Sequence, residues 1–105
     1  MRSLIVKRNK SFAGFLGKVQ VYISDKNGDV DIHGQYCRKL GDLKNGEEKT
    51  FTIDTAAATV YVIGDISTKD FCVDAKAIPE GTAEVHLSGK VTLDPQSGNP
   101  FIFDK

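Results

Sequence analysis

The stretch Lys18-Val19-Gln20-Val21-Tyr22-Ile23-Ser24 decides the fold class of this protein. Successive side chains of an extended chain point to opposite sides, so Val19, Val21 and Ile23 share one face. Strict alternation that is rich in β-branched residues is typical of a β-strand with one buried face. The stretch therefore predicts a strand that packs on a hydrophobic core.

A turn and a second strand are predicted directly after this stretch. Asn27-Gly28 lies at the centre of residues 25–29, and this pair tolerates the positive φ angles of a tight hairpin turn. Residues 30–33 alternate again, with Val30 and Ile32 as the apolar positions. We therefore expect a hairpin in which residues 30–33 return beside the first strand.

Similar alternating segments recur along the chain, and turn residues separate them. The further predicted strands are residues 4–8, 36–40, 49–54, 59–63, 71–78, 83–88, 90–93 and 101–103. Residues 41–47, centred on Asn45-Gly46, and Pro79-Glu80-Gly81-Thr82 are predicted turns, and the charges within 71–78 favour an edge strand. Many short strands without a helical crossover predict an all-β fold, a single antiparallel β-sandwich of about 7–9 strands with little or no helix. At 105 residues, we expect one domain over residues 1–105.

The charges are distributed unevenly, although the formal net charge is zero. Five of the 14 basic residues precede position 25, whereas all 14 acidic residues lie from Asp25 onward. A basic segment of this kind can bind an anionic partner. It is equally typical of a positive strand that lies beside a negative one, because opposite charges stabilise cross-strand pairs.

No apolar run is long enough for a signal peptide, or for the roughly 20 residues that span a bilayer. We therefore expect no transmembrane segment and, by default, a cytoplasmic location. Cys37 and Cys72 are then expected as reduced thiols that pack like small hydrophobic residues, although a secreted domain could pair them. Two cysteines alone cannot hold a zinc ion, so we expect neither a metal site nor a cofactor.

The basic segment also contains aromatic residues, and it supplies the first candidate binding residues. Lys7, Arg8 and Lys10 are followed by Phe12 and Phe15. Basic residues with aromatic rings occur in nucleic-acid sites and in membrane-surface loops. The zero net charge argues against both, and we expect no nucleic-acid partner. Core packing of an irregular strand is the alternative explanation for the two phenylalanines.

Tyr22 and Tyr61 are a second pair of candidate binding residues. Each lies between apolar neighbours that alternate with it along a predicted strand. Exposed tyrosines on a sheet can form a platform for a carbohydrate or a peptide. The two rings can equally cover the second face of the sandwich.

Two further patterns suggest chemistry but are weak. Residues 25–31 place oxygen side chains at alternate positions, as calcium loops do, but Tyr36 stands where an EF-hand has its bidentate glutamate. Glu84 shares a strand face with His86, so an acid–base dyad is conceivable, and His33 is the second histidine of the chain. No nucleophile elbow and no phosphate-binding glycine loop accompanies them, so we expect no enzyme.

Two stretches resemble a known family. Pro79-Glu80-Gly81-Thr82, followed by Ala83-Glu84-Val85-His86-Leu87-Ser88-Gly89-Lys90, is similar to the turn and strand that name the small bacterial β-sandwich modules of the PEGA type. Leu43-Lys44-Asn45-Gly46-Glu47, running into residues 50–53 and Val60-Tyr61-Val62, resembles the second half of such a module. The two pieces occur here in the reverse order, and Thr82 replaces the alanine. The resemblance implies an accessory, non-enzymatic interaction module of uncharacterised function.

We therefore expect a non-catalytic module that presents a sheet face or an edge strand to an unknown protein partner or to a second copy of itself. Lys7, Arg8 and Lys10 are expected to contribute to partner binding. A sandwich that binds carbohydrate or another ligand through its tyrosines is the alternative. A small enzyme built around His86 and Glu84 is the third hypothesis.

Overall fold

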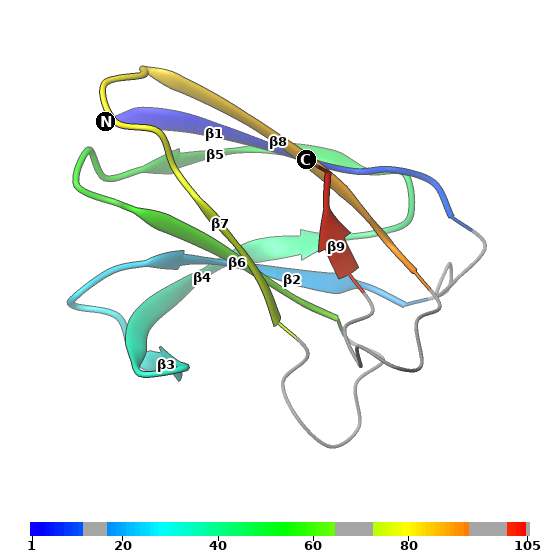
Figure 1. The fold of residues 1–105 in the computed structure, drawn as a ribbon, viewed down its shortest axis with the longest axis horizontal. Helices are drawn as coiled ribbons and strands as arrows, with labels where there is room; N and C mark the ends of the chain where they lie inside the picture. Colours follow the sequence, from blue (N-terminus) through cyan, green and yellow to red (C-terminus); the bar gives the residue numbers. More distant parts are fainter. Residues whose placement is uncertain (12–16, 65–72, 93–100, 105) are drawn as a thin grey trace.

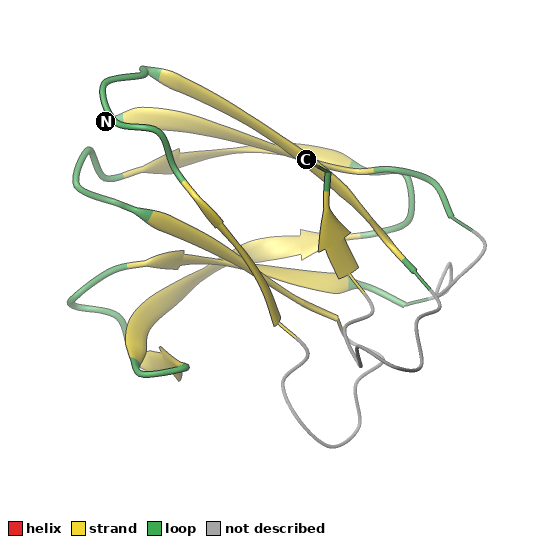
Figure 2. Cartoon of the chain, viewed as in Figure 1, coloured by secondary structure: helices red, strands yellow, loops and turns green. Residues whose placement is uncertain are grey.

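The computed structural model describes residues 1–11, 17–64, 73–92 and 101–104, and within them the chain forms nine strands (Figures 1 and 2). The strands are β1 (Arg2–Arg8), β2 (Val19–Ser24), β3 (Val30–Ile32), β4 (Gln35–Leu43), β5 (Glu48–Ile53), β6 (Thr59–Gly64), β7 (Val73–Ala77), β8 (Glu84–Val91) and β9 (Phe101–Phe103). No helix occurs in these four described segments.

The strands form two sheets that pack face to face, which confirms the predicted all-β sandwich (Figure 1). One sheet has the order β5-β1-β8-β9 and the other the order β3-β4-β2-β6-β7. The alternating apolar residues of both sheets meet between them. The buried core comprises Leu4, Val6, Val19, Val21, Ile23, Leu43, Ile53, Ala57, Val60, Val62, Ile78, Val85, Val91, Phe101 and Phe103.

One strand pair is parallel, contrary to the expectation of antiparallel pairing throughout. β1 runs parallel to β8, with a register from Ser3↔Glu84 to Arg8↔Gly89. The expectation relied on the absence of a helical crossover. A crossover exists, but strands make it, because the chain passes through the opposite sheet between β1 and β8.

The predicted turn around Asn27-Gly28 is present, because the amide of Gly28 donates to the carbonyl oxygen of Asp25 (2.8 Å), but the predicted hairpin of β2 with β3 is wrong. β3 pairs with β4 rather than with β2, whose neighbours are β4 and β6. Gly28 is required because the backbone of Cys37 lies too close for a side chain, and not because of a positive φ. A Cβ at this position would lie 2.1 Å from the carbonyl oxygen of Cys37. The β3–β4 hairpin instead turns at His33 and Gly34, whose φ angles are 51° and 85°. His33 is therefore a turn residue rather than the end of a strand.

The second Asn-Gly pair is a turn, as predicted, but it does not close a hairpin. It joins β4 to β5, which belong to different sheets. The amide of Glu47 donates to the carbonyl oxygen of Lys44 (3.0 Å), and Gly46 has a φ of 78°. The Lys44–Glu47 turn therefore carries the chain from one layer of the sandwich to the other.

β7 is an edge strand, as its charged residues predict, and polar contacts link it to β9 of the other sheet. Asp74 Oδ2 accepts a hydrogen bond from the amide of Phe103 (2.7 Å). Lys76 Nζ donates to the carbonyl oxygen of Asp104 (3.1 Å). These two contacts connect the layers along this side of the sandwich.

Candidate functional site

The first strand carries two buried arginines. Arg2, Leu4, Val6 and Arg8 alternate with more exposed residues, and all four are buried. The side chains therefore face the interior, although an arginine is almost never fully buried without partners. The two guanidinium groups lie at opposite ends of β1 and have different surroundings.

Arg8 is enclosed in the core, so the expectation that it binds a partner at the surface is not supported. Its exposed fraction is 0%. Nη1 donates to the carbonyl oxygens of Gly17 (2.8 Å) and Leu43 (2.9 Å). Burial lowers the pKa of the Arg8 guanidinium, but an arginine remains protonated in a folded protein. We therefore assign Arg8 to cross-linking of the two sheets, because Leu43 ends a strand of the opposite sheet.

Lys7 and Lys10 are exposed, as a binding role requires. Lys7 lies directly opposite Glu48 across the β1–β5 pair, which fits the interpretation of oppositely charged neighbouring strands. The aliphatic part of Lys10 packs on the Lys44–Glu47 turn, because a Cβ on Gly46 would lie 2.8 Å from its Cγ. Both lysines therefore flank the start of β5. Phe12 and Phe15 lie outside the described residues.

Tyr22 and Tyr61 are direct cross-strand neighbours in β2 and β6. The exposed fraction of Tyr22 is 9%, and its hydroxyl donates to Gln20 Oε1 (2.7 Å). Tyr61 is half-buried, and burial is the main cause that raises the pKa of its hydroxyl. They belong to a second apolar cluster with Val30, Ile32, Cys37 and Ile63. The rings thus cover the outer face of the five-stranded sheet rather than form an open platform.

Cys37 is a free and fully buried thiol in this second cluster. Burial raises its pKa, and the nearby charge of Asp31 raises it further. A protonated, buried thiol is unreactive and packs as a small apolar side chain. Cys72 lies outside the described residues.

The alternating oxygens of residues 25–31 take part in local turns. Asp25 Oδ1 accepts a hydrogen bond from the amide of Asn27 (2.9 Å), and Asp25 Oδ2 pairs with Arg38 Nε (3.3 Å). Asp31 Oδ1 accepts from the amide of Gly34 (2.8 Å). Among the described residues, no three His, Cys, Asp or Glu side chains are grouped to hold a metal ion.

Glu84 and His86 contact each other through Oε1 and Nε2, as their shared strand face suggested. Both side chains are largely exposed, at 59% and 68%. They lie on the outer face of the four-stranded sheet, where β1 presents Ser3 and Ile5 beside them. This contact is open to solvent and lies outside the cleft described next.

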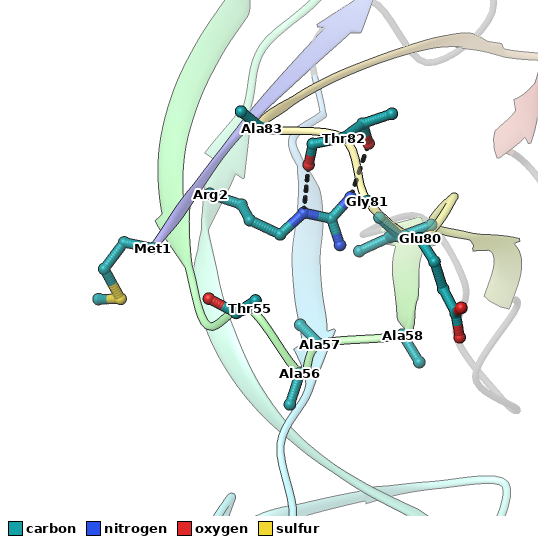
Figure 3. Close-up of a pocket in the computed structure, with 11 residues that line it drawn as sticks. Met1, Arg2, Thr55, Ala56, Ala57, Ala58, Glu80, Gly81, Thr82 and Ala83 are labelled. Atoms are coloured by element: carbon teal, nitrogen blue, oxygen red, sulfur yellow. Dashed lines mark hydrogen bonds between the residues drawn. The ribbon is translucent and has the colours of Figure 1, made fainter.

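A cleft of about 520 Å³ opens at the end of the sandwich where β1 begins (Figure 3). The turns at residues 55–58 and 80–83 form its walls, and Arg2 and Ile78 contribute from the buried side. Arg2 Nε donates to the carbonyl oxygen of Thr82 (2.6 Å). Its Nη2 donates to the carbonyl oxygen of Pro79 (2.6 Å) and to Thr82 Oγ1 (2.8 Å). The guanidinium therefore holds the Pro79-Glu80-Gly81-Thr82 turn, in which Gly81 has a φ of 78°.

Arg2 lies outside the predicted strand of residues 4–8, although β1 begins at Arg2. Arg2 has the same parity as Leu4, Val6 and Arg8. Extending the alternation back by two residues would have placed both arginines on the buried face. The partner turn lies about 80 positions away in sequence, and no local pattern identifies it.

Among the strands that the structure describes, β5 is a free edge of the four-stranded sheet, on the side opposite β9. The amide of Arg8 donates to the carbonyl oxygen of Glu47 (2.8 Å). This hydrogen bond identifies which residues of β5 form backbone hydrogen bonds with β1. Bonded and non-bonded pairs alternate along an antiparallel ladder. Glu48, Thr50 and Thr52 therefore direct their N–H and C=O groups away from β1, and all three are exposed.

Comparisons with known proteins found no matching family model, no similar curated protein and no similar solved structure. The part of the chain that the structure describes contains no helix with the length and apolar character needed to cross a membrane.

Proposed function

We propose that this protein is a non-catalytic interaction module that pairs the free edge of β5 with a strand of a protein partner or of a second copy. The observation that carries the proposal is the outward direction of the backbone groups of Glu48, Thr50 and Thr52. Strand addition to a sheet edge draws its affinity from main-chain hydrogen bonds and needs few special side chains. This mode of binding is compatible with a sequence whose recognisable motifs are turns and strands, because it requires no catalytic or ligand-binding motif.

The other edges are less suited to this role. β3 and β9 have three residues each, against six in β5. β7 has five residues, but Asp74 and Lys76 tie it to the β9 segment of the other sheet. β5 is also composed of residues that favour strands, since Thr50-Phe51-Thr52-Ile53 are all β-branched or aromatic.

Charged residues at the start of β5 restrict what can pair there. Lys49 lies on the edge strand and contacts Glu47 (3.7 Å). A lysine on an edge strand opposes indiscriminate pairing of identical edges. Lys7 and Lys10 flank the same end, so an incoming strand with acidic residues near this end is favoured over a basic one.

Proline at position 50 tests the proposal. Thr50→Pro removes an N–H that points away from β1, so the β1–β5 ladder is kept and the outer edge is blocked. We expect the variant to raise the Kd of self-association or of partner binding about tenfold or more. Analytical ultracentrifugation measures self-association, and capture from the native host followed by mass spectrometry identifies a partner.

Thr50→Val is the matched control, because it keeps the N–H and the β-branched shape. It should retain association, while urea unfolding of both variants checks that the sandwich is intact. A Thr50→Pro protein that is folded and still associates like the wild type would rule out the β5 edge. Charge reversal at Lys7 and Lys10 should weaken association and reduce its dependence on salt.

The carbohydrate hypothesis is not favoured by the placement of the tyrosines. A sugar stacks on an exposed ring face, whereas Tyr22 is buried and Tyr61 is half-buried in an apolar cluster.

A further inference from the structure

We propose that the cleft beside Arg2 binds the carboxylate of a small organic acid with a short aliphatic body. The guanidinium is held from one side by the 79–82 turn and faces the alanines of the 55–58 turn on the other side (Figure 3). This site is separate from the β5 edge and does not depend on strand addition there.

The donor inventory of Arg2 leaves one nitrogen for a ligand. A guanidinium has five N–H donors. Arg2 uses the Nε hydrogen for the Thr82 carbonyl and the two Nη2 hydrogens for Pro79 and Thr82 Oγ1. No hydrogen bond from Nη1 to another described residue is found, and Figure 3 shows the remaining guanidinium nitrogen pointing toward the alanines. The two hydrogens of Nη1 are thus available to an acceptor in the cleft.

Arg2 is also a buried charge without a counter-ion among the described residues. Its exposed fraction is 7%, and no acidic side chain of the described segments forms an ion pair with it. The three acceptors that hold it are neutral carbonyl and hydroxyl oxygens. A buried cation is costly unless an anion compensates it, so an anionic ligand gains more here than at the surface.

The other residues that line the cleft restrict the size and the charge of the ligand. Ala56, Ala57, Ala58 and Ala83 give the cleft a small, mainly apolar lining. Glu80 is the only acidic residue among the described residues that line the cleft, and its carboxylate points away from the guanidinium in Figure 3. The described lining has one cationic side chain, Arg2, and one anionic side chain, Glu80, which does not suit a polyphosphate that carries several charges. A single carboxylate on a short aliphatic chain matches both the charge and the lining.

Titration of the full-length ¹⁵N-labelled protein with sodium butyrate tests the proposal directly. Butyramide, which has the same shape without the charge, and sodium chloride at matched ionic strength are the controls. We expect saturable shifts of the amides of residues 55–58 and 79–83, with affinity about tenfold or more above that for butyramide. Equal effects of butyrate and butyramide, or butyrate shifts spread over the surface lysines, would overturn the proposal.

Two variants sharpen the assignment. Arg2→Met should reduce butyrate affinity about tenfold or more, while Arg38→Met removes a partly exposed arginine that does not line the cleft and should leave the affinity unchanged. Butyrate binding that survives in a folded Arg2→Met protein would also overturn the proposal. If Arg2→Met does not fold, Glu80→Gln takes its place and should leave affinity equal or raise it about twofold. Weaker binding in Glu80→Gln would contradict an anion in this cleft.

The two proposals, carboxylate binding beside Arg2 and strand pairing at the β5 edge, can be tested independently. Thr50→Pro, which blocks the edge, is expected to bind butyrate like the wild type. Loss of butyrate binding in Arg2→Met is likewise expected without loss of association.

Discussion

Arg2 and Arg8 share a strand, a face and an inward direction, yet one is closed in the core and the other borders a cleft. Arg8 is entirely enclosed and bonds to the carbonyl oxygens of Gly17 and Leu43. Arg2 bonds to a turn whose residues Pro79 and Thr82 are exposed. The same residue type therefore joins layers at one end of β1 and leaves a cationic nitrogen available at the other.

The role of a buried arginine therefore depends on whether water can reach the oxygens that accept its hydrogen bonds. Leu43 is the last residue of an internal strand and is fully buried, so water cannot replace the Arg8 guanidinium as the donor to its carbonyl oxygen. The carbonyls of the 79–82 turn lie at the rim of an open cleft, where water can reach them. The loss of each arginine should therefore have a different cost.

The largest expected effect is that of Arg8→Met. The methionine keeps much of the apolar stem but leaves two carbonyl oxygens without their donor, which costs roughly 3 kcal/mol of unfolding free energy. Urea unfolding followed by tyrosine fluorescence measures the loss, because the chain has no tryptophan. Arg38→Met, which removes a partly exposed ion pair, serves as the control and should cost below about 0.5 kcal/mol.

Arg2→Met should have a smaller effect on stability, of about 1–2 kcal/mol, because its acceptors can be hydrated after the substitution. The same urea titration compares it with Arg8→Met. A loss as large as that of Arg8→Met would show that the two ends of β1 are equally closed, and the contrast between them would fail.

Thr82→Val should have the smallest effect, near 1 kcal/mol, since it removes the hydroxyl that accepts from Arg2 Nη2 and donates to the carbonyl oxygen of Pro79 (3.3 Å). Thr55→Val, on the other wall of the cleft, is the matched control and should remain within about 0.5 kcal/mol of the wild type. Identical stabilities of the two variants would indicate that Thr82 Oγ1 contributes nothing to holding the guanidinium.

Much of the secondary structure could be predicted from the sequence, but the pairing of the strands could not. Alternation located β2, and proline with glycine located the Pro79-Glu80-Gly81-Thr82 turn, because both signals depend on neighbouring residues. Asn27-Gly28 lies in a local turn, as its composition predicts, but the hairpin of β3 forms at His33-Gly34. The turn did not determine which strands pair, because pairing β3 with β4 buries Ile32 and Cys37 in one cluster.

Some of the candidate binding residues are exposed, as predicted from the sequence, and others are not. Lys7 and Lys10 are exposed as expected, whereas Arg8 is buried and Tyr22 packs in an apolar cluster. Arginine and tyrosine occur both at the surface and in the interior. Only the position of the two arginines in the alternation of β1 indicated that their side chains are buried. Neither the β5 edge nor the cleft can be predicted from composition, since each depends on which strands are neighbours.

By itself, the sequence determined that the protein is built of short strands, because the alternation of apolar side chains is a local property of an extended backbone. Only the tertiary structure decided that β1 and β8 run parallel and that β5 is left at an edge. It also brought Arg2 against Thr82, 80 positions away. Contacts of this kind follow from burying the apolar faces of both sheets together, which no short stretch of sequence encodes.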